Sequence, residues 1–321
     1  MAKQDSYLGW KLDFTQPPGE PAYAEPDSVS WRVFKNPVTG AIGGACAVLL
    51  EFADPRIRTG VWEHSVYPVD PVGRAERTGY ASAIGTYGPQ SAARRVIAGI
   101  TNMHSKVEGK TPNGRPYRAL EPELLDWVSA TAGYGFLTAY DRFAGPLSEE
   151  DKKRFWSEGY EVSGLYGVQR RAGSLEGFNE MMMELVPGFE PHQINFDFLD
   201  IMENAQAERD VPKFIRRYIA RAAIDILPPI VREKLQLGKE YDLSPFGRMV
   251  VKLLARRADR MKDLNGPAAQ SSERLGLPRD FLWRSQAAQK KLVGELRASG
   301  KLKPAKPIDA SAPRAASQAA E

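Results

Sequence analysis

Apolar residues recur at intervals of three and four along most of the chain, which is the spacing of one face of an α-helix. Runs in which apolar and polar residues alternate, as they do in strands, are nearly absent. The pattern predicts helices over residues 41–52, 56–66, 73–86, 91–107, 122–143, 148–166, 175–185, 197–207, 212–227, 245–262 and 278–298. The chain is therefore predicted to be all-α.

Local signals mark some of the helix ends. Ser148 followed by Asp151 is typical of a capping box, and Gly145-Pro146 would stop the helix before it. Between His104 and Pro122, residues 109–116 (Gly-Lys-Thr-Pro-Asn-Gly-Arg-Pro) are dense in turn-forming residues, which predicts a surface loop.

The two ends of the chain differ from this pattern. Residues 1–38 contain several prolines and little periodicity, so they are predicted to form an extended arm that its aromatic side chains pin to the body. Residues 301–321 are small, polar and rich in Pro and Ala, which predicts a disordered tail. A single helical domain over residues 39–300 lies between them.

Composition excludes few functions. The 44 basic and 40 acidic side chains of the 321 residues leave a net charge of +4, which does not require a nucleic-acid partner. The longest apolar run, residues 41–50, falls short of the roughly 18–20 residues that span a bilayer. The first residues do not resemble a secretory signal, so a cytoplasmic protein is expected. Cys46 is the only cysteine and is expected to be a small core residue.

Basic and apolar residues interleave in two segments of the C-terminal third, residues 212–227 and 245–262. Amphipathic basic helices of this kind can lie on an anionic membrane. The commoner alternative is the solvated face of a packed helix. Peripheral membrane contact therefore stays open, and the sequence predicts no oligomeric state.

Three histidines, His64, His104 and His192, limit the available metal chemistry. The paired-histidine and Glu-x-x-His spacings of zinc and di-iron sites are missing, and so are the P-loop, dinucleotide and nucleophile-elbow motifs. Haem stays compatible because the macrocycle supplies four nitrogen ligands and requires only one from the protein.

His104 shares a predicted helix face with Val96, Ile97 and Ile100, so it points to the core side. It is either a haem ligand or a core histidine bonded to a carbonyl. Upstream, glycines concentrate in residues 39–51, which indicates close packing against another helix or against a flat ligand.

Arg74 and Thr78 lie four residues apart, near the start of a predicted helix. A guanidinium and a hydroxyl on one face there could clamp an anion such as a haem propionate. Alternatively, Arg74 pairs with Asp70 or Glu76, and Thr78 bonds back to a carbonyl.

Taken in order, these stretches resemble the latex-clearing-protein or rubber-oxygenase catalytic domain family, whose fungal relatives cleave prenyl chains at the endoplasmic reticulum. The resemblance covers about residues 39–170. Its motifs are a small-residue helix ending in Leu-Leu-Glu51, Gly60-Val-Trp-Glu-His-Ser65, Asp70-Pro-Val-Gly-Arg-Ala-Glu-Arg-Thr78, Met103-His-Ser-Lys-Val-Glu-Gly109, Gly114-Arg-Pro-Tyr-Arg-Ala-Leu120, Leu125-Asp-Trp-Val-Ser-Ala-Thr131 and Tyr140-Asp-Arg-Phe-Ala-Gly-Pro-Leu147.

The resemblance implies a globin-like helical core around haem b, with His104 as the ligand to the iron. It places Arg74 and Thr78 in a motif that lines the haem. Arg77 stands where rubber-cleaving members carry a lysine that approaches the distal iron, and an arginine ligates iron poorly because it keeps its proton. Glu51 and Ser129 replace a glutamine and a histidine of many bacterial relatives, so the substrate does not transfer.

The implied activity is oxidative cleavage of a C=C bond by dioxygen in a hydrophobic small molecule. His64 is the predicted distal acid or base, with Glu63 as the runner-up, because neighbours on a helix diverge by about 100° and cannot both aim at one spot. Either could instead be a surface charge. Met and Phe residues over 178–198 line an apolar cavity or pack the core, and His192 is expected to be structural.

Two other functions stay open at this point. One is a haem enzyme that uses peroxide, or that rearranges its substrate without dioxygen. The other is a haem or gas-binding protein without catalysis.

Overall fold

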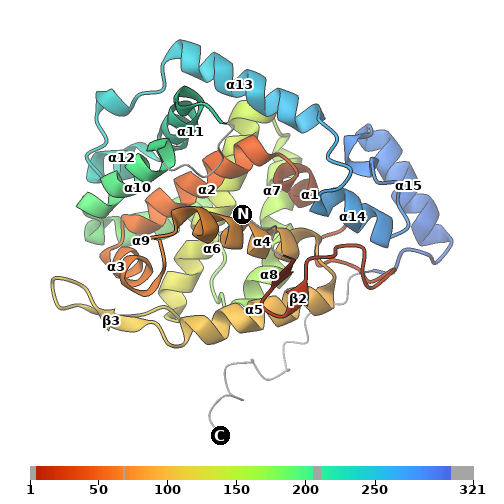
Figure 1. Ribbon diagram of the computed structural model, residues 1–321, viewed down its shortest axis with the longest axis horizontal. Coiled ribbons are helices and arrows are strands. Elements are labelled where there is room, and N and C mark those ends of the chain that lie inside the picture. The colour runs from red at the N-terminus through yellow and green to blue at the C-terminus, as the bar shows by residue number, and fades with distance from the viewer. Residues whose placement is uncertain (1–4, 68, 205–210, 305–321) are drawn as a thin grey trace, which may run out of the picture.

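The computed structural model describes residues 5–67, 69–204 and 211–304. Helices make up nearly all of its regular structure, which confirms the all-α prediction (Figure 1). The first helices are α1 (Val29–Phe34), α2 (Pro37–Phe52), α3 (Pro55–His64), α4 (Pro71–Tyr87), α5 (Gln90–His104), α6 (Pro122–Ala139), α7 (Glu149–Glu158) and α8 (Tyr160–Leu165). The later ones are α9 (Leu175–Leu185), α10 (Gln193–Asn204), α11 (Lys213–Asp225), α12 (Pro229–Lys234), α13 (Pro245–Arg260), α14 (Pro267–Arg274) and α15 (Gln286–Ala298). The globin-like arrangement of the core stays a prediction.

Short elements complete the described chain. The two small antiparallel hairpins pair β1 (Ser6–Tyr7) with β2 (Trp10–Lys11) and β3 (Glu108–Lys110) with β4 (Pro116–Arg118). The single-turn helices are η1 (Tyr140–Ala144), η2 (Val186–Gly188), η3 (Lys239–Tyr241) and η4 (Phe281–Trp283). The predicted surface loop before α6 thus contains the hairpin β3–β4.

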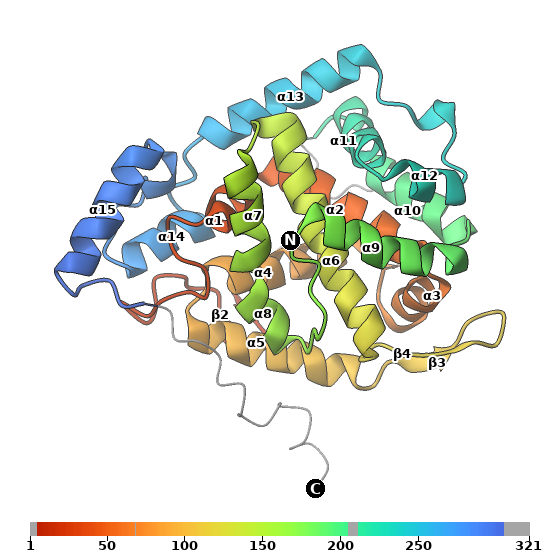
Figure 2. The same ribbon diagram turned by 180° about the vertical axis from the view of Figure 1, so that it is seen from behind.

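Helices α2 and α6 cross at the centre of the molecule (Figure 2). Asn36 starts α2, because its side chain accepts hydrogen bonds from the N–H groups of Val38 and Thr39. At the crossing, a Cβ atom built on Gly43 would lie 2.8 Å from the carbonyl oxygen of Gly135. Gly43 therefore allows close packing of α2 against α6, which is the first of the two alternatives given for the glycines of residues 39–51.

The boundary signals of the sequence mostly hold. The Ser148 side chain accepts a hydrogen bond from the N–H of Asp151 at 3.1 Å, as the capping-box pattern predicts. The long helix predicted before Gly145 is α6 followed by the π-helical turn η1. Helices α1, α12 and α14 have no predicted counterpart, and each is eight residues or shorter. Such short helices give too few turns for a periodic apolar pattern.

The N-terminal arm docks on the helical body, but it is not wholly extended. It contains β1, β2 and α1, and the side chains of Trp10 and Trp31 are buried. The buried guanidinium of Arg274 in α14 donates hydrogen bonds to the carbonyl oxygens of Phe14, Glu20 and Tyr87. One side chain of α14 thereby fixes the arm to the end of α4.

The C-terminal end differs from its prediction at one described position. Leu302 is buried in the same hydrophobic cluster as the arm. Its apolar side chain was too isolated among lysines and prolines to indicate burial. The remainder of the predicted tail, residues 305–321, lies outside the described residues.

Candidate functional site

The first part of the site is the start of α4. The Asp70 side chain accepts a hydrogen bond from the N–H of Gly73 at 2.9 Å and so starts the helix. Arg74 lies in its first turn, and Nη1 of Arg74 donates to Oγ1 of Thr78 one turn later. Thr78 Oγ1 in turn donates to the carbonyl oxygen of Arg74 at 3.0 Å. The predicted pairing of the guanidinium and the hydroxyl is present, together with the predicted back-bond.

His104 is the last residue of α5 and is partly buried. Burial, and then the positive charge of Arg74, lower the pKa of its imidazole below the ordinary 6.5. The ring is therefore neutral at pH 7, as a metal ligand must be. Among the described residues the imidazole makes no hydrogen bond, so the structure does not support a core histidine bonded to a carbonyl.

Glu51, the last residue but one of α2, completes the group. Burial raises the pKa of its carboxyl to about 7, although a hydrogen bond from Thr131 and the charge of Arg74 oppose that rise. Thr131 Oγ1 donates to Glu51 Oε1 at 3.2 Å from α6. The Glu51 side chain as a whole is half-buried.

Tyr67 lies between α3 and α4, and the charges of Arg74 and Glu51 influence its hydroxyl. Burial raises the pKa of its hydroxyl; the charge of Arg74 opposes the rise and that of Glu51 adds to it. Arg74 thus acts electrically on Glu51, Tyr67 and His104 alike. The charge of Arg74, at the start of α4, therefore acts on three other parts of the chain, namely the ends of α2 and α5 and the α3–α4 connection.

Arg77 lies beside this group and has a different partner. Its Nη1 is 3.5 Å from Oδ2 of Asp70. Burial raises the pKa of Tyr7 in the arm, and the charges of Arg74 and Arg77 oppose that rise. Asp70 therefore pairs with Arg77, not with Arg74 as the sequence alternative had it. The resemblance places Arg77 on the distal side of the haem as a candidate catalytic residue, and that role stays a prediction.

Glu63 and His64 end α3 and are both exposed. Nε2 of His64 is 3.2 Å from the hydroxyl of Tyr117 in β4, and that hydroxyl donates to Oε2 of Glu63 at 3.3 Å. The expectation that the two could not reach one spot is wrong, because at a helix end two long side chains converge on a group beyond the last turn. No contact between described residues joins this pair to Arg74 or His104. Their catalytic roles stay predictions.

The Met and Phe side chains after the site mostly pack the core. Phe178, Met181 and Phe189 are buried, and the rings of Trp127 and Phe178 stack with centroids 5.5 Å apart. This is the core alternative given for the stretch. His192 is structural as expected, since its Nδ1 accepts a hydrogen bond from the N–H of Ile194 at 3.2 Å.

Residues 31–260 match the family described as ER-bound oxygenase mpaB/B'/rubber oxygenase, catalytic domain. The chain belongs to this family. The resemblance drawn from the motifs is thereby confirmed, and the matched range is longer than 39–170 because it extends through α13. Membership in the mpaB/rubber oxygenase family makes oxygenase chemistry the class of activity. No curated protein and no solved structure matches the chain.

Two observations bear on what an oxygenase of this family could hold. Within residues 5–67, 69–204 and 211–304, no group of three or more His, Cys, Asp or Glu side chains could bind a metal ion. In the same ranges no single helix has the length and apolar content to cross a membrane. Only α2 and α3 together meet that test, and they are bent by 111° where they join.

Sequence reasoning missed Glu51 as a functional residue. It noted the carboxylate only as a departure from relatives, although an acidic residue at the end of an apolar helix was a usable signal. What raises the pKa of its carboxyl is burial by distant parts of the chain, and no local sequence pattern shows that burial.

Proposed function

We propose that the chain is a haem b-dependent oxygenase that cleaves a C=C bond of an apolar substrate with dioxygen. The observation that carries the proposal is the neutral His104 imidazole beside Arg74. The family supplies the class of chemistry, and this group of residues fits the cofactor.

The fit rests on the two residues that would hold haem. His104 has no protein partner among the described residues, so its ring is available as the one ligand that haem requires. Arg74 forms no ion pair with a described carboxylate, and its one bonded neighbour is a hydroxyl. A haem propionate would neutralise this guanidinium. When bound, haem supplies an iron that binds dioxygen.

Glu51 is the group that can handle a proton. With a pKa of about 7, its carboxyl is close to half-protonated at neutral pH and can donate or accept a proton at Oε1 or Oε2. Thr131 holds Oε1 through its hydrogen bond. Glu51 therefore joins His64 and Glu63 as a candidate acid or base, and it alone of the three lies in the group around Arg74.

An apolar substrate suits the side chains around Tyr67. Its ring lies 6.1 Å from Trp62, 6.4 Å from Phe52 and 5.9 Å from Phe198, measured between ring centroids. Aromatic side chains of this kind exclude water and can pack against unsaturated hydrocarbon. In the proposed reaction the C=C bond breaks and two C=O bonds form, with one oxygen atom of dioxygen in each product. Dioxygen is the only oxidant, and no external reductant is consumed.

The test is an absorption spectrum of the purified, haem-loaded chain beside its His104→Ala variant. The wild type should show a Soret band, and H104A should lose it or shift it. The matched control is H192A, which removes a histidine outside the group around Arg74 and should keep the wild-type ferric spectrum. No Soret band in the loaded wild type, or an unchanged spectrum in H104A, would refute haem binding through His104.

A second experiment addresses the reaction. Turnover of a panel of prenyl and aromatic alkenes under ¹⁸O₂ should place one labelled oxygen atom in each carbonyl product. E51Q should bind haem as the wild type does and turn over more slowly. Activity that needs hydrogen peroxide under anaerobic conditions would favour the peroxide-using alternative, and reversible oxygen binding without any product would favour a non-catalytic protein. Either result would refute the cleavage reaction.

A further inference from the structure

Helix α13 carries apolar side chains on its solvent side as well as on its packed side. Its packed side consists of Gly247, Val251 and Ala255. On the other side, Phe246, Met249 and Leu253 are 61%, 58% and 67% exposed. α13 runs along the outer edge of the molecule in both views (Figures 1 and 2). A helix that only packed against the body would show polar residues there.

The outward face also carries three arginines. At 100° per residue, the six side chains fall within an arc of about 100°. They are Phe246, Met249, Leu253, Arg256, Arg257 and Arg260. The first half of the face is thus apolar and the second half is cationic.

These arginines have no acidic partners. No described carboxylate forms an ion pair with Arg256, Arg257 or Arg260. Asp259, the one acidic residue of α13, lies beside two of these arginines, but its carboxylate lies 3.2 Å from Lys35 and accepts a hydrogen bond from Tyr140.

Other basic residues of the same region do have structural partners. Arg248 pairs with Asp225, and Arg221 donates to carbonyl oxygens before α13. The charge at the end of α13 is therefore not used to hold the fold together.

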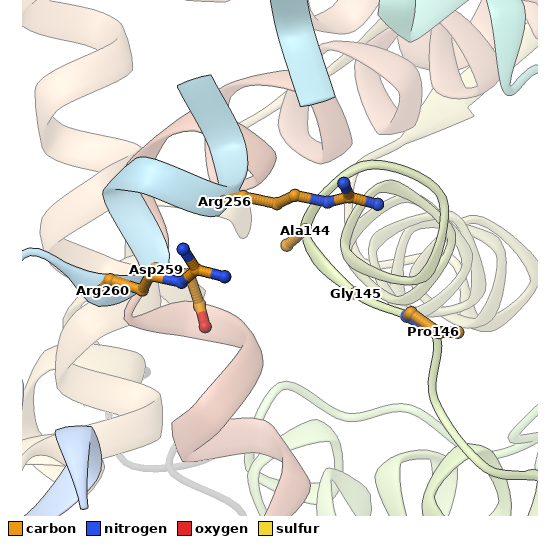
Figure 3. Close-up of a pocket in the computed structure, with 6 residues that line it drawn as sticks. All are labelled: Ala144, Gly145, Pro146, Arg256, Asp259 and Arg260. Atoms are coloured by element: carbon orange, nitrogen blue, oxygen red, sulfur yellow. The ribbon is translucent and has the colours of Figure 1, made fainter. Parts of the chain in front are cut away.

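The cationic half borders two hollows that share Arg256 and Arg260. In the first, of about 250 Å³, these two arginines and Asp259 face Ala144, Gly145 and Pro146 at the end of η1 (Figure 3). The second is lined by Leu253, Arg256, Arg257, Arg260 and Met261. Unpaired guanidinium groups beside apolar side chains match the two parts of a phospholipid, its phosphate and the start of its acyl chains.

We infer that the outward face of α13 docks on an anionic lipid bilayer. Met249 and Leu253 enter the interface while the three arginines contact lipid phosphates. A second copy of the chain suits this face less well, because an antiparallel twofold contact would set the unpaired arginines of one copy against the apolar half of the other. The inference is independent of the proposed haem chemistry, since it uses none of the residues around Arg74.

Vesicle flotation of the full chain tests the inference. Wild type should bind vesicles of phosphatidylcholine with phosphatidylserine, bind phosphatidylcholine alone poorly, and be released by salt. The triple variant R256A/R257A/R260A should lower the partition coefficient about 100-fold, at about fivefold per charge. M249S/L253S should lower it at least about tenfold.

The matched control is K110A/K153A/K290A, which removes three exposed charges from β3, α7 and α15. It should bind nearly as the wild type does. An environment-sensitive dye on L253C should report an apolar environment only with anionic vesicles, and labelling is selective because native Cys46 is buried. All these changes are at exposed positions, so circular dichroism should show the wild-type fold.

Several results would overturn the inference. They are no binding of wild type at low salt, wild-type binding by the arginine triple variant, or equal binding to neutral vesicles. Release by inorganic phosphate, but not by sodium chloride of equal ionic strength, would indicate a pocket for free anions instead. A concentration-dependent dimer that M249S/L253S abolishes would assign the face to a second copy.

Discussion

Glu51 gives a pH-dependent stability that can be measured without knowing the substrate. Burial raises the pKa of its carboxyl from 4.5 to about 7. The folded protein then binds the proton more tightly than the unfolded chain does. Its contribution to stability is therefore full below about pH 4.5 and is lost as the pH rises through about 7. At about 1.4 kcal/mol per pH unit, the difference amounts to about 3 kcal/mol.

Glu51→Gln removes the charge and keeps an oxygen that can accept the Thr131 hydrogen bond. Urea unfolding followed by tryptophan fluorescence, across a pH series, gives the free energy of unfolding of both proteins. Near pH 5 the two should agree within about 1 kcal/mol, whereas near pH 9 E51Q should be more stable by about 3 kcal/mol. Other titrating groups cancel in the difference between the two proteins.

Glu63→Gln is the control, because this carboxylate is exposed. The free energy of unfolding of E63Q should follow that of the wild type within about 0.5 kcal/mol throughout the pH range. A difference between wild type and E51Q that stays constant from pH 5 to pH 9 would refute the assignment, because a desolvated carboxyl has to ionise within that range.

Three further predictions concern other parts of the molecule. Gly43→Ala should lower the free energy of unfolding, measured in urea, by about 1–3 kcal/mol, because the added methyl group would meet the backbone of α6. Gly40→Ala adds a methyl group that meets nothing and should not destabilise the protein, so equal effects of the two changes would refute the close packing. Arg274→Met should lower the free energy of unfolding, measured by thermal unfolding, by about 3 kcal/mol, because three carbonyl oxygens lose their hydrogen-bond donor. R279M, which removes the exposed ion pair with Glu273, should lower it by at most about 1 kcal/mol. An unchanged stability of R274M would show that other contacts hold the arm. Arg74→Leu should lose haem faster than the wild type to apomyoglobin, whereas R77L should retain haem as the wild type does. Faster loss from R77L than from R74L would refute the assignment of Arg74 to a propionate.

The parts of the site that could be predicted from sequence lie within single helices. The spacing of four between Arg74 and Thr78 led to their pairing, because residues four apart share a helix face. The same periodicity predicted that His104 lies on the core side of its helix, and the structure shows it partly buried. Such relations depend only on helix geometry, which the sequence pattern specifies locally.

The parts that could not be predicted depend on contacts between distant segments. Glu51 is close to Arg74 only because α2 ends beside the start of α4, and no spacing rule encodes that. In the same way, Glu63 and His64 both contact the hydroxyl of Tyr117 because the hairpin β3–β4 lies beside the end of α3. The sequence left open whether the basic amphipathic helix over residues 245–262 contacts a membrane, for a related reason. Periodicity shows that a helix has an apolar side and does not show which side the body covers.

The range shared with the family, residues 31–260, leaves two pieces of the chain outside it. The first is residues 1–30, which make up most of the arm, and the second follows residue 260 and includes α14 and α15. These pieces share one hydrophobic cluster, and Arg274 of the second bonds to Phe14 of the first. Neither therefore has a complete partner surface without the other. A version of the chain trimmed at either end alone would uncover apolar surface on the piece that remains, so a shortened protein has to keep both pieces or lose both.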